Sequence, residues 1–126
     1  MKEITTDEAP AAIGPYSQGI RDGATVYVSG QGPLDPASGE IVGDTIAEET
    51  ERTLSNVEAI LEAAGGSLDD VVKSTVFLQD MATYEAVNEV YGERFSDPYP
   101  ARSAVEVADL PVDIGVEIEV IASIPE

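Results

Sequence analysis

The chain has 126 residues, of which 43% are hydrophobic, and its 25 acidic residues face only six basic ones. Because the formal net charge is −19, it has too few cations to displace the counterions of a nucleic acid or to bind an anionic membrane surface. The absence of cysteine and histidine excludes disulfides, cysteine nucleophiles, zinc sites of the usual kind and triads that need imidazole. Acid–base chemistry is therefore left to carboxylates, tyrosine or lysine.

The length predicts a single domain, residues 1–126, with a modest core that association between copies would help to stabilise. No apolar run approaches the length of a membrane span, and the N-terminus has no basic segment followed by an apolar one, so we expect a soluble, cytoplasmic protein. The acidic residues are spread along the chain rather than gathered in a tail. This distribution favours the hypothesis of a halophilic protein, whose self-repulsion a very salty cytosol would screen.

The first part of the chain predicts an irregular lead-in, residues 1–15, followed by a hairpin. Residues 17–22 and 25–29 have the composition of short strands, and Asp22-Gly23 is a two-residue turn signal between them. The glycine-rich segment 30–33 lacks the Lys-Ser/Thr ending of a phosphate-binding loop. Its glycines instead permit another group to approach the main chain closely.

The middle of the chain predicts two helices with a buried strand between them. The first helix runs from about residue 45 to residue 64 and ends at Gly65-Gly66, with acidic residues near its start that suit the helix dipole. Residues 71–79 are apolar, β-branched and aromatic, as is typical of a largely buried strand. The second helix lies near residues 82–95.

One polar residue interrupts the core-facing stripe of this second helix. The stripe comprises Tyr84, Val87, Tyr91 and Phe95, and Asn88 lies on it, four residues after Tyr84 and three before Tyr91. A buried amide needs hydrogen-bond partners, which are either groups of the protein itself, the commoner case, or a bound ligand.

Two strands with alternating side chains end the chain. In residues 101–107, Arg102, Ala104 and Glu106 point one way, and in residues 116–122, Glu117 and Glu119 are opposed to the apolar positions. A guanidinium suggests carboxylate binding, and a carboxylate on a rigid strand suggests proton transfer. The alternative is that these charges lie on a solvated sheet face, which is the usual place for Arg and Glu.

These elements predict the order β-β-α-β-α-β-β. Two helices would cover one face of a single mixed sheet, which makes the fold class α+β. The other sheet face still needs a cover, so we expect subunits to associate.

Several segments together carry a resemblance to a known family. They are APAAIGPYSQG at 9–19, VSGQ at 28–31, YEAVN at 84–88, and PARSAVEV at 100–107 with VEIE at 116–119. With these motifs the chain resembles the RidA family, also called YjgF, the reactive-intermediate imine deaminases. The similarity extends over nearly the whole chain and is more specific than any one short motif.

The resemblance implies a chorismate-mutase-like α+β fold and a homotrimer with active sites in clefts between subunits. It also implies hydrolysis of reactive 2-imino acids, such as 2-iminobutanoate and 2-iminopropanoate, to 2-keto acids and ammonia. Family members perform this reaction without a metal or an organic cofactor. The partners it implies are therefore small anionic imino acids and further copies of the chain.

Matched by position, the resemblance implies that Arg102 holds the substrate carboxylate and Glu117 orients and deprotonates the attacking water. It implies that the pocket is lined by Tyr16, Ser29, Gly30, Asn88 and Ala104. Ala104 stands where family members often have cysteine, which removes a thiol-based redox role but nothing that hydrolysis needs. Burial in a cleft would raise the pKa of Glu117, whereas a nearby Arg102 would lower it.

Three other functions compete with imine hydrolysis. A non-catalytic regulatory module would use the same arginine to hold a small carboxylate. RNA cleavage, a label that some family members carry, is opposed by the net charge of −19 and the absence of histidine. A holdase-like role finds little support, since no exposed apolar tract is evident in the sequence.

Overall fold

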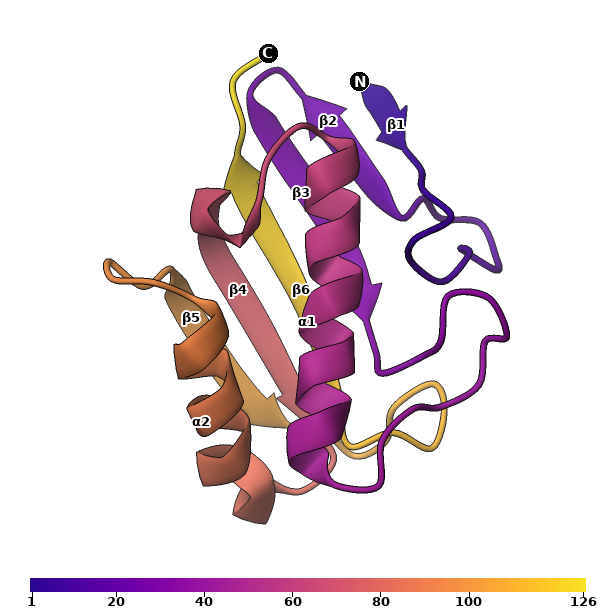
Figure 1. The fold of residues 1–126 in the computed structure, drawn as a ribbon, viewed down its shortest axis with the longest axis vertical. Helices are drawn as coiled ribbons and strands as arrows, with labels where there is room; N and C mark the ends of the chain where they lie inside the picture. The colour runs from indigo at the N-terminus through magenta and orange to yellow at the C-terminus, as the bar shows by residue number, and fades with distance from the viewer.

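In the computed structural model, which describes residues 1–126, one mixed sheet of six strands carries two helices on one face (Figure 1). The strands lie in the order β1-β2-β3-β6-β4-β5. Their bounds are β1 Lys2–Ile4, β2 Gly19–Asp22, β3 Thr25–Gln31, β4 Val71–Leu78, β5 Ala101–Glu106 and β6 Val116–Ser123. Helices α1 (Ile46–Ala63) and α2 (Tyr84–Arg94) are accompanied by two short 3₁₀ turns, η1 (Leu68–Asp70) and η2 (Met81–Thr83). The expected α+β fold is confirmed.

One strand escapes the sequence pattern. The composition of residues 1–15 predicts an irregular segment, but β1 pairs antiparallel with β2, with Glu3 opposite Ile20. Its three residues include one buried side chain, Ile4, which is too little alternation to reveal a strand. The element order is therefore β-β-β-α-β-α-β-β.

Helix α1 begins and ends where local chemistry dictates. The Thr45 hydroxyl accepts a hydrogen bond from the backbone N–H of Glu48 at 3.1 Å, and Gly65 takes a φ of 90° just beyond the last turn. Arg21 of β2 then closes this end of the helix, because its guanidinium donates to the carbonyls of Ala64 and Ile124, both at 2.6 Å. A cation thus meets the free carbonyls of the helix and ties them to both hairpin and C-terminus.

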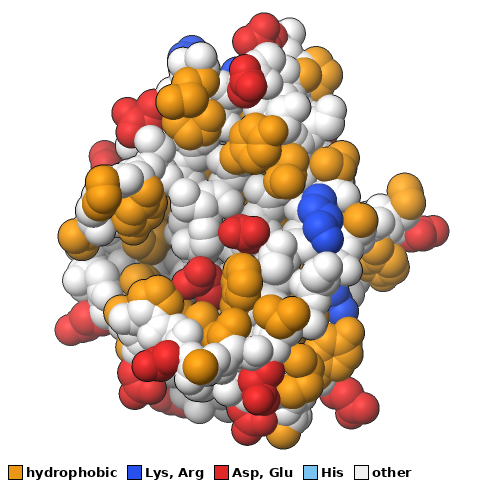
Figure 2. Space-filling view, turned by 180° about the vertical axis from the view of Figure 1, so that it is seen from behind, with side chains coloured by type: hydrophobic (Ala, Val, Ile, Leu, Met, Phe, Trp, Pro, Cys, Tyr) orange, Lys and Arg blue, Asp and Glu red, His pale blue; other side chains and the backbone are white.

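The core lies between the helices and the sheet. Val116, Ile118 and Val120 of β6 are buried under α1, so Glu117 and Glu119, which alternate with them, face the other way. Figure 2 shows this open face of the sheet, with acidic side chains near its centre and hydrophobic ones around them. None of the helices combines enough length and apolar character to cross a lipid bilayer.

Candidate active site

The carboxylate expected to act on water lies beside a β-bulge. Between Val28 and Gln31 the register of β3 shifts against β6, and this irregularity brings the backbone of Gly30 against the Glu117 side chain. A Cβ placed on Gly30 would lie 2.9 Å from the carboxyl carbon of Glu117. A side chain at this position would displace the Glu117 carboxyl group, so the glycine leaves the space in which that group lies. This agrees with the close approach expected from the sequence.

A cavity of about 620 Å³ opens next to this contact. Glu117, Glu119, Tyr16, Ser29 and Gly30 line it, together with apolar side chains of the loop that joins β5 to β6. The Ser29 hydroxyl donates to the carbonyl of Ser17 at 2.6 Å, which fixes its orientation. Three of the predicted pocket residues thus meet the predicted base, and we call Tyr16, Ser29, Gly30 and Glu117 the carboxylate half.

Burial raises the pKa of Glu117 above its usual range, and the neighbouring negative charge of Glu119 raises it further. Arg102 of the same chain does not counteract this rise. A carboxyl group with a raised pKa exchanges protons closer to neutral pH than an exposed glutamate does, as a general acid–base catalyst requires.

The guanidinium lies in a different setting. Arg102 is level with Ser74 of the parallel neighbour β4 and packs against two tyrosines of α2. Its Cζ lies 4.7 Å from the ring centroid of Tyr91 and 5.5 Å from that of Tyr84, and its Nη2 donates to the Tyr84 hydroxyl at 2.9 Å. Tyr91 is held in turn by a 2.6 Å hydrogen bond with Ser74.

Asn88 and Ala104 lie beside this arginine. The Asn88 amide and the Arg102 guanidinium, in that order, lower the pKa of the Tyr84 hydroxyl, so all three groups are close together. The Asn88 Oδ1 is buried without a hydrogen-bond partner, so one acceptor of this amide is unsatisfied in the single chain. Ala104 follows on the same face of β5 and is partly buried. We call Asn88, Arg102 and Ala104 the guanidinium half.

The two halves lie on opposite faces of the sheet. Arg102 is level with Ser74 and Glu117 with Phe77, and residues an odd number of positions apart on one strand point to opposite sides. A single chain therefore does not bring Arg102 and Glu117 together. Their meeting stays a prediction that requires a second copy.

Comparison with known proteins identifies the family. The sequence profile of the family described as Endoribonuclease L-PSP matches residues 6–124. The chain belongs to this family, which is the RidA or YjgF family. A RutC family protein of Pyrococcus horikoshii is 53% identical over 97% of this chain and 98% of its own length. The 2-iminobutanoate/2-iminopropanoate deaminase of Bos taurus is 50% identical over 96% of this chain and 88% of its own length.

Solved structures agree with this membership. RidA from an Antarctic Psychrobacter bacterium superposes with a TM-score of 0.94 at 48% identity, covering 98% of this chain and 100% of that one. TdcF of E. coli, solved with bound serine, has a TM-score of 0.91 at 44% identity and covers 98% of each chain. The chain therefore has the RidA fold expected from its sequence.

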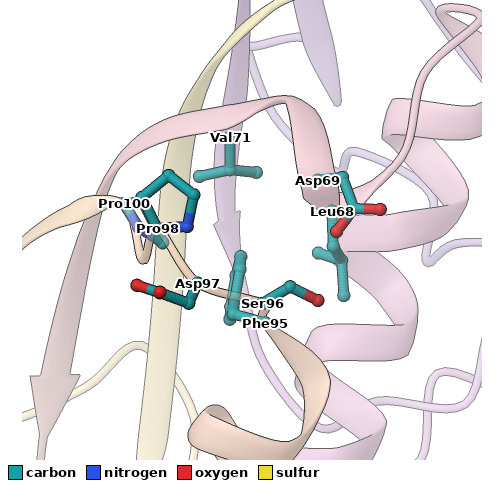
Figure 3. Close-up of a pocket in the computed structure, with 8 residues that line it drawn as sticks. All are labelled: Leu68, Asp69, Val71, Phe95, Ser96, Asp97, Pro98 and Pro100. Atoms are coloured by element: carbon teal, nitrogen blue, oxygen red, sulfur yellow. The ribbon is translucent and has the colours of Figure 1, made fainter.

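A second hollow of this RidA fold suits its chemistry less well. A cavity of about 340 Å³ lies between η1 and the segment after α2, with Asp69 on one side, Asp97 and Pro98 on the other, and Phe95 between them (Figure 3). Two carboxylates and no basic side chain line it. An anionic substrate would be repelled there, so it is not the candidate site.

The sequence pattern does not reveal the supporting role of some residues. Tyr84 and Tyr91 belong to the apolar stripe of α2, but they also hold Arg102. Asn56 of α1 is buried, and its amide donates to the carbonyls of Gly32 at 3.0 Å and Leu34 at 2.9 Å. It thereby fixes the loop that follows the bulge. A polar residue in an apolar stripe is the available signal for this role.

Proposed function

We propose that this RidA family member hydrolyses 2-imino acids, such as 2-iminobutanoate and 2-iminopropanoate, to 2-keto acids and ammonia. The observation that carries the proposal is Glu117, a half-buried carboxyl group of raised pKa in a cavity shaped by Gly30. The name of the bovine relative and the serine bound to TdcF support it, since serine has the carboxylate and the adjacent nitrogen-bearing carbon of such substrates.

Arg102 is suited to hold the substrate carboxylate. A guanidinium has five N–H donors in a planar arrangement that matches a carboxylate with two parallel hydrogen bonds. In the structure only Nη2 of Arg102 has a protein partner, so a pair of donors stays free. This contact would orient the imine carbon toward one bound water molecule.

Glu117 would then move the protons. As the water oxygen adds to the carbon of the protonated imine, the carboxylate takes a proton from the water and a carbinolamine forms. The carboxylic acid returns this proton to nitrogen. The C–N bond breaks, ammonia leaves, and the hydroxyl proton passes to the carboxylate as the C=O bond forms. The carboxylic acid gives this last proton to the departing ammonia, which restores the Glu117 carboxylate. The protonated imine and water thus become a 2-keto acid and ammonium.

Completing the site requires at least two copies of the chain. Because the halves lie on opposite faces of the sheet, one self-complementary patch cannot contain both of them. The guanidinium half of one copy would therefore meet the carboxylate half of the next in a head-to-tail contact. Such contacts form a ring when the rotation between successive copies closes. This geometry supports the homotrimer that the family resemblance implies.

A coupled assay tests the activity. A threonine dehydratase or an amino-acid oxidase generates the imine, and release of keto acid and ammonia is followed with and without this protein. We expect release above the spontaneous rate, and a loss of roughly a hundredfold or more in kcat for Glu117→Gln, the usual size of a general acid–base contribution. Release at the spontaneous rate with wild-type protein would refute the proposal.

The same variants separate catalysis from mere binding. A regulatory module would bind 2-oxobutanoate through Arg102 equally well with Glu117→Gln, and its wild type would not accelerate hydrolysis. Cleavage of RNA, which the family description names, is disfavoured for this chain because a net charge of −19 repels a polyanion and no histidine is present.

A further inference from the structure

One donor of Arg102 is already occupied by a residue of its own chain. Nη2 donates to the Tyr84 hydroxyl at 2.9 Å, and the Tyr84 ring lies 5.5 Å from Cζ. Nε and Nη1 make no hydrogen bond to the protein, and neither is a buried atom without a partner. The tyrosine therefore contacts one end of the guanidinium and leaves the rest open.

We propose that Tyr84 is a positioning residue, whose hydroxyl selects the edge of the Arg102 guanidinium that receives a substrate carboxylate. The inference rests on the proposed function and deepens it. Nη2 carries two hydrogens, one paired with a hydrogen of Nη1 and the other with that of Nε. Whichever hydrogen the hydroxyl accepts, one parallel pair stays intact for two hydrogen bonds to the substrate.

The position of Arg102 makes this support necessary. β5 is an edge strand, paired only with β4, so the arginine lacks a neighbouring strand on its other side. The Tyr91 ring covers one side of the guanidinium, but its hydroxyl is engaged with Ser74 and offers Arg102 no hydrogen bond. The Tyr84 hydroxyl is the group that fixes rotation of the guanidinium within its own plane.

Tyr84 also makes the contact sensitive to pH. The charged group that faces the Tyr84 ring is Arg102 from β5, and the titratable Tyr91 of the same helix lies against the same guanidinium. Glu106, farther along β5, instead accepts a hydrogen bond from the backbone N–H of Met81. The Asn88 amide and Arg102 lower the pKa of Tyr84 below its usual value of 10.0. As pH rises through this lowered pKa, the phenolate pairs with Arg102 and repels the incoming carboxylate.

The decisive variant is Tyr84→Phe, which keeps the ring and removes the hydroxyl. In the imine assay we expect KM to rise about tenfold, because the variant loses the charge-assisted hydrogen bond between Arg102 and the Tyr84 hydroxyl, which prepares Arg102 to bind substrate. The value of kcat should change little, because this bond takes no part in the chemical step. In the wild type we expect the affinity for 2-oxobutanoate to fall at alkaline pH. In Tyr84→Phe this alkaline decline should be absent. The control is Tyr99→Phe, which removes the hydroxyl of an exposed tyrosine that donates to the carbonyl of Gly92 and not to Arg102. It should match the wild type.

A second measurement does not depend on catalysis. Subtracting the near-ultraviolet titration of Tyr84→Phe from that of the wild type isolates the phenol of Tyr84. We expect its pKa to lie below the usual tyrosine value of 10.0, and Arg102→Gln should raise this pKa because the adjacent positive charge is gone.

The outcomes are separable. A wild type without hydrolytic activity overturns the proposed function, while keto-acid binding and the phenol titration still decide the role of Tyr84. Unchanged KM, an unchanged alkaline decline or an ordinary pKa for Tyr84 overturns the positioning role. If Tyr84→Phe melts far below the wild type, the ultraviolet titrations of the wild type and of Arg102→Gln are compared directly, without subtraction. An upward shift of the tyrosine that ionises first supports its contact with Arg102, and no shift overturns it.

Discussion

The two halves of the proposed site are held in place by different means. Glu117 lies on β6, which has a paired strand on each side, so backbone ladders fix its Cα and the bulge of β3 shapes the space around it. Arg102 lies on the edge strand β5 and is fixed by side chains of α2. Substitutions that fill the space beside the backbone should therefore damage the carboxylate half. Substitutions that remove side-chain contacts should damage the guanidinium half.

Mixing two inactive variants gives the largest expected effect. Arg102→Lys loses the planar donor pair and Glu117→Gln loses the base, so each alone should be nearly inactive. If the halves meet between copies, oligomers that contain both variants have some interfaces with an intact Arg102 facing an intact Glu117. We expect activity to return when the two are dissociated and reassembled together, as measured by the coupled assay.

The control for this experiment carries both substitutions in one chain. Mixed with itself, or with either single variant, the double variant creates no interface in which an intact Arg102 faces an intact Glu117. No gain from mixing Arg102→Lys with Glu117→Gln, in oligomers shown to exchange subunits, would place the two residues in separate sites and remove the head-to-tail arrangement.

Gly30→Ala should have the next largest effect, on the carboxylate half alone. The new Cβ would lie 2.9 Å from the Glu117 carboxyl carbon, so the carboxylate must move. A misplacement of about 1 Å costs about a hundredfold in rate, and we expect a loss of this size because the base no longer reaches the water. Binding of 2-oxobutanoate through Arg102 should change less than the rate.

Gly92→Ala is the matched control, because a Cβ on this helical glycine meets nothing within 4 Å. It should keep wild-type activity and stabilise the fold by about 0.5–1 kcal/mol, as replacing a helical glycine by alanine usually does. Equal activity of Gly30→Ala and Gly92→Ala would show that Glu117 does not need the space beside Gly30.

The sequence predicts the sheet face of the carboxylate half better than that of the guanidinium half. Alternation in residues 116–122 correctly separates Glu117 from the buried Val116 and Ile118, because a hydrophobic core faces one side of β6. In β5 the same rule groups Arg102 with Ala104 but does not tell which sheet face they occupy. The register with Ser74 decides that, and parallel pairing between distant segments leaves no local signal.

The same limit explains the supporting tyrosines and the opposite faces. Tyr84 and Tyr91 have the spacing of core residues, and no feature of the α2 sequence indicates that they contact an arginine of β5. That the two halves point away from each other follows from tertiary pairing alone. The family motifs indicate which residues to compare, whereas the geometry between them comes from the structure.

Glu119→Gln should have a smaller effect, again on the carboxylate half. Below the pKa of Glu117 the carboxyl is protonated and cannot accept a proton, so kcat/KM rises with pH through that pKa. The negative charge of Glu119 contributes to the raised pKa of Glu117. Neutralising it should lower that pKa and move the acid limb of the profile to lower pH.

Glu62→Gln serves as the comparison, because this exposed glutamate on α1 does not line the cavity. It removes the same charge from the chain and should leave the acid limb in place. An equal displacement of the limb by both variants would trace the effect to net charge rather than to the contact between the two carboxylates on β6.

Salt tests a weaker force that acts on both halves alike. Of the six basic residues only Arg94 meets carboxylates, at 3.5 Å from Glu51 and 3.2 Å from Glu58, whereas Arg21, Arg52 and Arg102 donate to neutral groups. Most of the 25 acidic residues are therefore unpaired, and their mutual repulsion weakens the folded state until salt screens it. We expect the melting temperature to rise between low and molar KCl, as it should in a halophilic protein. A melting temperature that does not change with KCl would refute that hypothesis. A rise at constant oligomeric state would show that the added stability comes from screening on the surface of each chain rather than from assembly of the site.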